Sequence, residues 1–367
     1  MSPIITLRPA EACAYDLVCL GEVMLRLDPR EHRIRTARSF DVWDSGAEYN
    51  VAKAMRGTFG LRAAIVTAFA DNEVGRLLEN IIAASQLDLS FVRWVPFDGI
   101  GARARNGLNF TERGFGVRGG VGCADRANTA ISQLRPEDVD LDTLFVRRGT
   151  RWFHTGGIMA GLSEQAAQTA EAFMRAAKAS GACVSYDLNY RPSLWKARGG
   201  LDECREVNRR LAGLADVVFG NEEDYSACLG YETNADASYT HLDAGAYEAM
   251  VTRLTSDFAN LRVVAVSLRQ VRSASRNDWG GLAWCARDGF VRSTWREGLE
   301  VFDRIGGGDS FASGIIYGLM AFDDLSRAVE YGAANGAWVM TTPGDTTTAS
   351  LAELDGLLAG AAARVQR

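Results

Sequence analysis

The sequence has little histidine, and its cysteines form no metal-binding or disulfide pattern. Three histidines among 367 residues are too few for a histidine-based metal site or catalytic dyad. The seven cysteines are an odd number without a C-x-x-C pair, which argues against a disulfide framework and a zinc knuckle. We therefore expect reduced core thiols at Cys13, Cys19, Cys123, Cys183, Cys204, Cys228 and Cys285.

Long apolar runs and blocks of like charge are also missing. No run of about twenty apolar residues occurs, and the first fourteen residues lack the basic start and apolar stretch of a secretion signal. Acidic residues number 46 against 40 basic ones, and the eight tryptophans are dispersed, so no nucleic-acid-binding surface is indicated. We expect a cytoplasmic protein with small-molecule partners and neither a nucleic-acid nor a membrane partner.

What the sequence does contain is an alternation of short β-rich apolar runs with longer amphipathic ones. Helices are predicted at 47–59, 74–86 and 163–180. This order predicts an α/β fold with a mostly parallel central sheet flanked by helices. We expect one domain over residues 15–367 after an N-terminal tail of residues 1–14. The predicted strands are 15–20, 62–68, 151–155, 182–187, 216–219 and 262–268.

Two segments interrupt this alternation, at about residues 23–45 and 96–123. The second carries eight glycines in a polar, arginine-bearing stretch, so it cannot form a buried crossover helix. If the two segments pair as strands, they form a small sheet that stands off the main domain as a lid over a cleft. The alternative is a pair of solvated surface loops.

The segment VFDRIGGGDSFASGIIYGLM, residues 301–320, joins three consecutive glycines to an aspartate and a helical apolar series. The periodicity places Asp309 at or near a helix start. The amides of Gly306, Gly307 and Gly308 can turn toward one point, where the helix dipole adds positive potential. This pattern predicts an anion hole for a phosphoryl group, with Asp309 as the base for an attacking hydroxyl. A flexible loop with an N-capping aspartate is the alternative.

This segment resembles the C-terminal signature of PfkB-type, ribokinase-like sugar kinases, D-T-x-G-A-G-D-x-F-x-x-G. Arg304 replaces the usual threonine and Gly307 the usual alanine, and neither change removes the anion hole or the base. Residues 16–29 resemble the family's first strand, and residues 45–60 resemble its G-G-x-x-x-N-x-A element. The resemblance covers nearly the whole chain and implies a ribokinase-like fold with a β-sheet lid, with ATP and Mg²⁺ as cofactors.

The resemblance also implies ligand contacts outside the signature. Asp224 closes the segment NEED, where the family carries N-x-x-E, and its shorter side chain implies that it contacts magnesium through water. Asp224 is also expected in the acidic first turn of a helix, which does not exclude the magnesium contact. The alternative for Asn50 is a local hydrogen bond. The implied sugar contacts are Gly46 and Asn50, and the implied ATP contacts are Asn221, Ser267, Arg269 and Asn335.

The segment YDLNYRPSLW, residues 186–195, bears on the substrate class. It is similar to a segment of 2-keto-3-deoxygluconate kinases in which the arginine faces the acid sugar, and this implies that Arg191 binds a carboxylate with both arms of its guanidinium. A structural arginine paired with an acid is the alternative. The lid departs from those kinases, because their second arginine has no counterpart at its usual place. The candidates to replace it are Arg105, Arg113 and Arg118.

The sequence therefore favours an ATP-dependent kinase that phosphorylates a sugar acid, with 2-keto-3-deoxygluconate as the first choice, and a homodimer formed through the lid edge. A fructokinase, a ribokinase and a 5-dehydro-2-deoxygluconate kinase are alternatives within this class. A non-catalytic sugar sensor on the same fold is another, although the intact Asp309 argues against it. A dinucleotide-dependent oxidoreductase would need G-x-G-x-x-G after an early strand, and the turn after Leu20 reads Gly-Glu-Val-Met.

Overall fold

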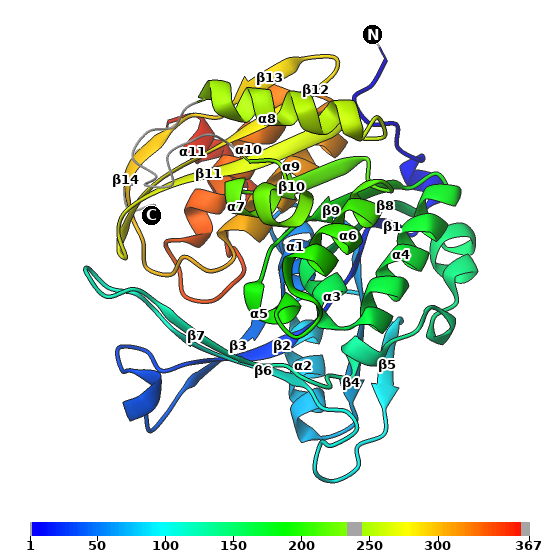
Figure 1. Ribbon diagram of the computed structural model, residues 1–367, viewed down its shortest axis with the longest axis vertical. Helices are drawn as coiled ribbons and strands as arrows, with labels where there is room; N and C mark the ends of the chain where they lie inside the picture. The colour runs from blue at the N-terminus through cyan, green and yellow to red at the C-terminus, as the bar shows by residue number, and fades with distance from the viewer. Residues whose placement is uncertain (1, 233–243, 361–367) are drawn as a thin grey trace.

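The computed structural model describes residues 2–232 and 244–360 (Figure 1). The main sheet contains β1 (Tyr15–Leu20), β4 (Ala63–Ala70), β5 (Val92–Val95), β8 (Thr150–Gly156), β9 (Cys183–Asp187), β10 (Val217–Gly220), β11 (Val263–Ser273), β12 (Arg276–Cys285), β13 (Gly289–Arg292) and β14 (Arg296–Glu300). Their order is β13-β12-β11-β10-β9-β8-β1-β4-β5, and β14 pairs with β12. Neighbours from β5 to β11 are parallel, whereas β12 is antiparallel to β11, β13 and β14. The prediction of a mostly parallel central sheet is confirmed.

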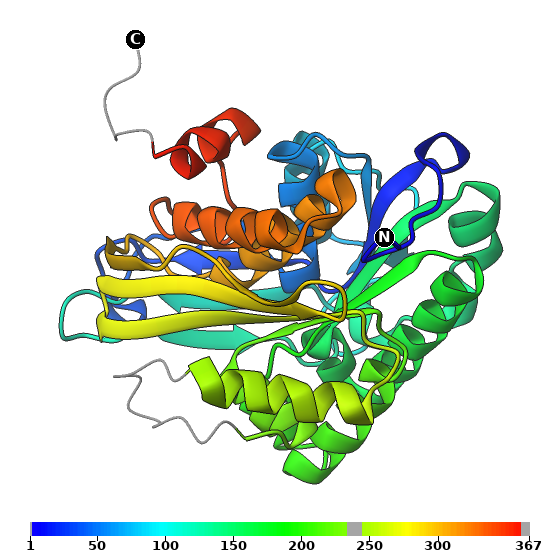
Figure 2. The same ribbon diagram turned by 90° about the horizontal axis from the view of Figure 1, so that it is seen from above.

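Helices cover both faces of this sheet. They are α1 (Ala47–Gly57), α2 (Glu73–Ala84), α3 (Gly157–Leu162), α4 (Glu164–Ala179), α5 (Pro192–Trp195), α6 (Gly200–Ala212), α7 (Glu222–Asp224), α8 (Ala244–Asp257), α9 (Gly307–Phe322), α10 (Leu325–Val339) and α11 (Leu351–Leu358). In Figure 2 the sheet is seen between α9, α10 and α11 on one face and the green helices on the other. Within β1, Val18 and Leu20 belong to one core and Leu17 and Cys19 to the other, and all four are fully buried. Burial on both faces explains why residues 17–20 of this strand form a continuous apolar run.

The six predicted strands and three predicted helices are all present, with ends that shift by a few residues. In the main sheet, strands β5 and β12 to β14 were not predicted. The pair Gly280 and Gly281 in β12 is typical of a turn in sequence, but a Cβ on Gly281 would collide with the ring of Phe311 from α9. Glycine in this strand therefore allows the helix to approach closely.

Two smaller expectations need correction. The N-terminal tail is partly integrated into the main domain, because Ile4 and Ile5 are buried and the Ile4 amide donates to Asp323 at 2.8 Å. Six of the seven thiols are buried as predicted, but Cys123 is exposed because it lies on a strand whose residues all face solvent. In the described part of the chain, no helix combines the length and apolar character needed to cross a membrane.

The two segments that interrupt the alternation of strands and helices form a separate four-stranded sheet, which we call the small sheet. Its strands are β2 (Met24–Asp28), β3 (Asp41–Ser45), β6 (Gly107–Glu112) and β7 (Val121–Asp125), in the order β3-β2-β6-β7. The central pair β2 and β6 is parallel, and the outer pairs are antiparallel. Figure 1 shows the small sheet projecting from one end of the molecule. The two segments therefore pair as strands and are not the solvated loops of the alternative. That the small sheet closes over the cleft as a lid remains a prediction.

Candidate active site

A cleft of about 940 Å³ lies where the small sheet meets the carboxyl ends of the main strands. Asp187 ends β9 and Asn221 follows β10, so the cleft occupies the position where parallel α/β sheets bind ligands. Eleven of the twelve residues predicted for the site line this cleft. They are Gly46, Asn50, Arg191, Asn221, Asp224, Ser267, Arg269, Gly306, Gly307, Gly308 and Asp309.

The glycine loop leads directly into α9. Gly306 precedes the helix in the left-handed conformation with φ of 78°, and a Cβ there would collide with the backbone carbonyl oxygen of Asp345. Glycine is therefore required at this position. A Cβ on Gly307 would meet only Trp279, at 3.8 Å, and one on Gly308 would meet nothing within 4 Å. As the first residues of α9, Gly307 and Gly308 have amides without acceptors inside the helix, which is the arrangement that binds anions.

Asp309 lies in the first turn of α9 and is 8% exposed. Asn50 Nδ2, from α1, donates to Asp309 Oδ2 at 2.7 Å, and Thr346 Oγ1 donates to Asn50 Oδ1 at 3.0 Å. Burial raises the pKa of Asp309 to about 7, although the hydrogen bond from Asn50 opposes this rise. A carboxyl group that titrates near neutral pH is suited to general-base catalysis. The structure thus places Asn50, predicted as a sugar contact, directly against Asp309, the predicted base.

Two further aspartates line the cleft beside Asp309. Burial raises the pKa of Asp187 well above its ordinary value, and the charges of Asp224 and Asp309 raise it further. Asp224 accepts hydrogen bonds from the amides of Tyr190 at 2.7 Å and Asn221 at 2.8 Å. Asn221 Oδ1 in turn accepts from the Asp224 amide at 3.1 Å, so these two residues cap α7. The acidic helix start predicted for Asp224 is therefore present, and it lies in the wall of the cleft.

The arginines near the cleft differ in their partners. Arg191 Nη1 donates to the carbonyl of Tyr190 at 2.8 Å, and no carboxylate of the described residues lies within ion-pair distance of Arg191. Its charge nevertheless lowers the pKa of Asp309. Of the three lid candidates, only Arg113 lines the cleft. Its Nε lies 3.2 Å from Asp28, whereas Arg118 pairs with Glu112 and Arg105 with Asp125.

Asn335 is the one predicted site residue that does not line the cleft. It is fully buried in α10, and its Nδ2 donates to the Ser310 carbonyl at 3.0 Å and to Ser313 Oγ at 3.1 Å. These contacts fasten α10 to α9, so the side chain is not accessible to a nucleotide. The ATP contact expected of Asn335 is therefore not supported, and its side chain packs α10 against α9 instead.

Sequence reasoning missed several charged residues that line the cleft, among them Asp187, Arg126 and Asp345. Asp187 had a usable signal, since it is a polar residue at the carboxyl end of a predicted strand. Arg126 follows β7 and its Nε donates to Glu22 at 2.8 Å, and Asp345 lies in the loop after α10. Neither loop residue belongs to a periodic pattern, so nothing in the local sequence marks them.

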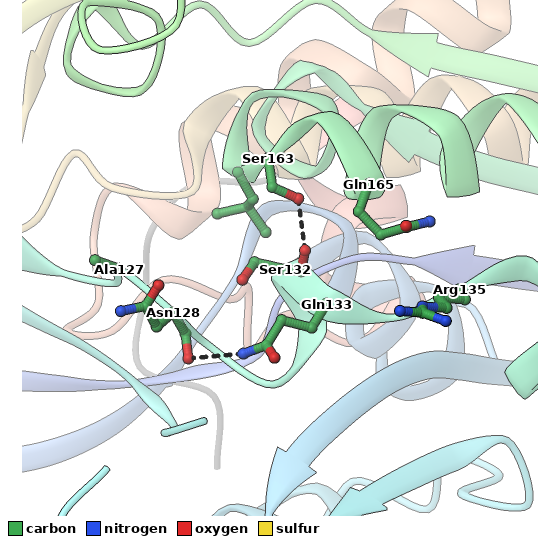
Figure 3. A pocket seen from close by; sticks show the side chains of 8 residues that line it. Ala127, Asn128, Ser132, Gln133, Arg135, Ser163 and Gln165 are labelled. Atoms are coloured by element: carbon green, nitrogen blue, oxygen red, sulfur yellow. Dashed lines mark hydrogen bonds between the residues drawn. The ribbon is translucent and has the colours of Figure 1, made fainter. Parts of the chain in front are cut away.

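A second hollow, of about 460 Å³, lies at the surface near the start of α4 (Figure 3). Ser163 Oγ donates there to the Ser132 carbonyl at 2.5 Å, and Gln133 Nε2 donates to the Asn128 carbonyl at 3.3 Å. Its polar side chains thus serve the local fold, and its lining includes no acidic side chain. The larger cleft is therefore the candidate active site.

Comparison with known proteins shows which proteins this chain is similar to. Residues 281–352 match the model of the pfkB family carbohydrate kinases. The chain is 30% identical to a 2-dehydro-3-deoxygalactonokinase of Haloferax volcanii, over 96% of this chain and 99% of that protein. It is 26% identical to a 5-dehydro-2-deoxygluconokinase of Shouchella clausii, over 90% of this chain and 91% of that protein. The crystal structure of a 2-dehydro-3-deoxygluconokinase from Thermotoga maritima superposes with a TM-score of 0.84 and 32% identity, covering 94% of this chain and 99% of that one.

Proposed function

This chain belongs to the pfkB family of carbohydrate kinases, and we propose that it phosphorylates a 2-keto-3-deoxy sugar acid such as 2-keto-3-deoxygluconate or its galacto epimer. The observation that carries the proposal is the position of Arg191. This residue lines the cleft that also contains Asp309, and its guanidinium lacks a carboxylate partner among the described residues. The named relatives are all kinases of sugar acids, which supports an acidic substrate.

The proposed chemistry uses the carboxylate of Asp309 and the backbone amides of the glycine loop, which meet at the start of α9. A hydroxyl oxygen of the sugar attacks the γ-phosphorus of ATP, its proton passes to Asp309 Oδ1, and the bond from the γ-phosphorus to the oxygen of ADP breaks. Asn50 holds the other oxygen of Asp309 and so orients the carboxylate. The amides of Gly306, Gly307 and Gly308 stabilise the negative charge of the transferring group.

Magnesium belongs to this proposal as a partner of the nucleotide. Within the described residues no cluster of three or more acidic, histidine or cysteine side chains is arranged to hold a metal by itself. Asp187 and Asp224 are buried carboxyl groups beside the cleft, and burial raises the pKa of both, so a nearby cation would relieve an unfavourable environment. We propose that Asp224 contacts the ion through water. The ion would neutralise phosphate charge, and Asn221, Ser267 and Arg269 would contact ATP.

The remaining parts of the proposal concern the oligomeric state and the cellular compartment. Every residue of β7 is exposed at the outer edge of the small sheet, and such an edge can pair with a second copy of the chain. We therefore propose a homodimer formed through the small sheet. We also propose that the reaction takes place in the cytoplasm, where ATP is supplied.

The test replaces Arg191 by alanine and by lysine. A charge-assisted contact to the substrate carboxylate contributes on the order of 2 kcal/mol, so Arg191→Ala should raise the KM for the sugar acid about thirtyfold and leave the KM for ATP nearly unchanged. Lysine should restore only part of the loss, because it keeps the charge but not the fork. Arg175→Ala is the matched control, since Arg175 pairs with Glu171 on the exposed face of α4.

The wild type should be assayed by coupled ADP release with the two keto-deoxy acids, 5-dehydro-2-deoxygluconate, fructose and ribose. A neutral sugar with the highest kcat/KM would reject the acid substrate and return Arg191 to a structural role. No turnover of any of these sugars would reject the kinase proposal and favour a sensor.

A further inference from the structure

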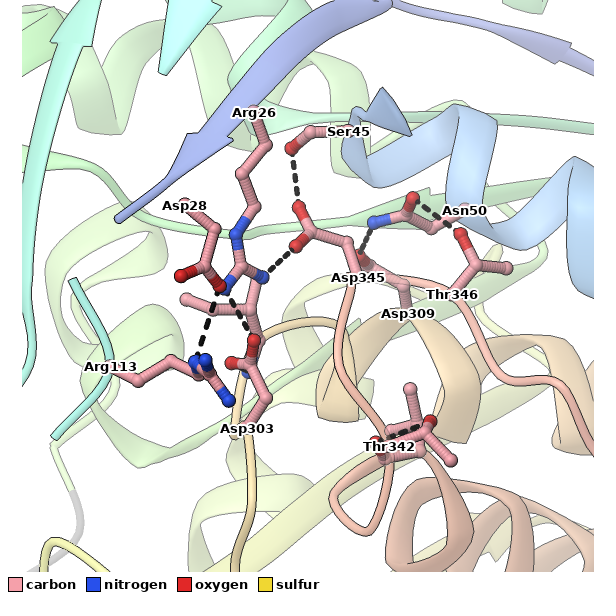
Figure 4. A network of polar contacts seen from close by, with 12 residues as sticks. Arg26, Asp28, Ser45, Asn50, Arg113, Asp303, Asp309, Thr342, Asp345 and Thr346 are labelled. Atoms are coloured by element: carbon pink, nitrogen blue, oxygen red, sulfur yellow. Dashed lines mark hydrogen bonds and ion pairs between the residues drawn. The ribbon is translucent and has the colours of Figure 1, made fainter. Parts of the chain in front are cut away.

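A guanidinium is completely buried on the small sheet. Arg26 lies in β2 and is 0% exposed. Its Nη1 donates to Asp345, and its Nη2 donates to Asp303 and, at 3.1 Å, to Asp28. Figure 4 shows this guanidinium among the three carboxylates, with Arg113 on the far side of Asp28. One side chain of the small sheet therefore joins two loops that are distant in sequence.

Such a buried ion cluster is better suited to fixing the positions of the segments that it joins than to stabilising the fold. Removing charges from water costs several kcal/mol per ion, so a buried ion pair seldom stabilises a fold more than apolar packing would. Losing one partner, however, would leave the other charges buried and unpaired, which costs free energy. The cluster is therefore restricted to the one arrangement in which its charges are paired. The position of β2 relative to the loops of Asp303 and Asp345 is thereby fixed.

The first loop leads into the anion hole. Asp303 also accepts the amide of Ile305 at 3.2 Å, which shapes the turn that enters the glycine loop. The carbonyl of Asp345 lies against the Cα of Gly306, where any Cβ would collide with it. Asp303 and Asp345, two of the three carboxylates paired with Arg26, thus belong to backbone segments that contact or continue into the glycine loop.

The second loop leads to the catalytic base. Thr346 follows Asp345 directly, and its Oγ1 donates to Asn50 Oδ1 at 3.0 Å. Asn50 then donates to Asp309 at 2.7 Å, so the chain of contacts from Arg26 to the base passes through one loop and one amide (Figure 4). Asp345 also accepts the hydroxyl of Ser45 at the end of β3, which is a second link from the small sheet.

We propose that Arg26 is a positioning residue for phosphoryl transfer, an inference that rests on the proposed kinase function. Its guanidinium, which extends from the small sheet, fixes the positions of the loops that carry Asp303 and Asp345. The glycine amides and Asp309 therefore reach the geometry needed for phosphoryl transfer only when β2 is packed against these two loops. Arg26 is fully buried and does not line the cleft. It acts through Asp303 and Asp345, so its loss affects turnover more than nucleotide binding.

The test compares Arg26→Met, which keeps the length of the side chain without charge, with Arg26→Lys, which keeps the charge but cannot bridge two loops with one fork. A displacement of about 1 Å at the reacting groups lowers kcat on the order of a hundredfold, and this is the loss expected for Arg26→Met. The dissociation constant for ATP, measured by calorimetry, should change by less than about twofold. Arg30→Met is the matched control, because Arg30 lies just after the end of β2 and forms an exposed pair with Asp41.

Thermal unfolding shows which variants are folded. Should Arg26→Met unfold, Arg26→Lys decides, with an expected loss of kcat of about tenfold or more in a folded protein. Wild-type kcat in either folded variant overturns the role of Arg26, and so does a loss of ATP affinity as large as the loss of kcat. The proposed function fails separately, if the wild type itself phosphorylates no sugar acid or sugar, and this inference then fails with it.

Discussion

Replacing Asp309 by asparagine tests the base and its burial in one variant. The side chain keeps its shape, and the new amide oxygen can still accept the hydrogen bond that Asn50 donates at 2.7 Å. The variant cannot take a proton from the sugar hydroxyl. We expect turnover to fall at least about a hundredfold while ATP binding is preserved, because this is the usual contribution of a positioned base.

The same substitution should stabilise the protein at neutral and alkaline pH. Burial raises the pKa of Asp309 from 3.8 to about 7. Between these values the folded state holds a proton that the unfolded state has released, so the stability of the wild type falls as pH rises and becomes level above about pH 7. One pKa unit corresponds to about 1.4 kcal/mol. The variant should therefore be more stable by up to about 4 kcal/mol above pH 7, and this difference should shrink by about 1.4 kcal/mol between pH 8 and pH 6.

Urea unfolding of wild type and variant at several pH values measures this difference, and coupled ADP release measures turnover. In the wild type, kcat/KM should rise with pH through about 7, as the base ionises. Asp140→Asn is the control, because Asp140 is an exposed carboxyl whose pKa is lowered by hydrogen bonds from Thr143. Near-normal turnover in Asp309→Asn would refute the assignment of the base. A stability difference that does not vary with pH would refute the reasoning from burial.

Two further predictions concern the glycine loop and the small sheet. Gly307→Val should lower kcat more than it weakens ATP binding, because its branched side chain crowds the amides at the start of α9, whereas Gly307→Ala should be nearly neutral, since its Cβ would meet only Trp279 at 3.8 Å. A fully active valine variant would mean that the loop does not hold the transferring phosphate. Hydrogen exchange at 23–45 and 96–123 should slow when the sugar substrate binds and the small sheet closes over the cleft. Unchanged exchange at saturating substrate would contradict closure.

The parts of the site that could be predicted from sequence are those whose chemistry lies within one short segment. Gly306 to Asp309 need only a run of small residues and a helix periodicity to be recognised. Asn335 shows the limit of transferring a position by resemblance, since an asparagine in an apolar helix faces the cleft or the neighbouring helix according to a rotation that the sequence does not reveal. The structure turns it toward Ser310 and Ser313.

The sequence by itself determined the alternation of strands and helices and the glycine loop that runs into a helix with Asp309 in its first turn, because periodicity, glycine conformation and helix starts depend on neighbouring residues. Only the tertiary structure decided that Asn50 contacts Asp309 and that Arg26 meets Asp303 and Asp345, which lie 277 and 319 residues away along the chain. These contacts depend on how the small sheet and two loops are packed against α9. The residues beside a charged side chain in the sequence do not reveal which distant residue it contacts in the folded protein.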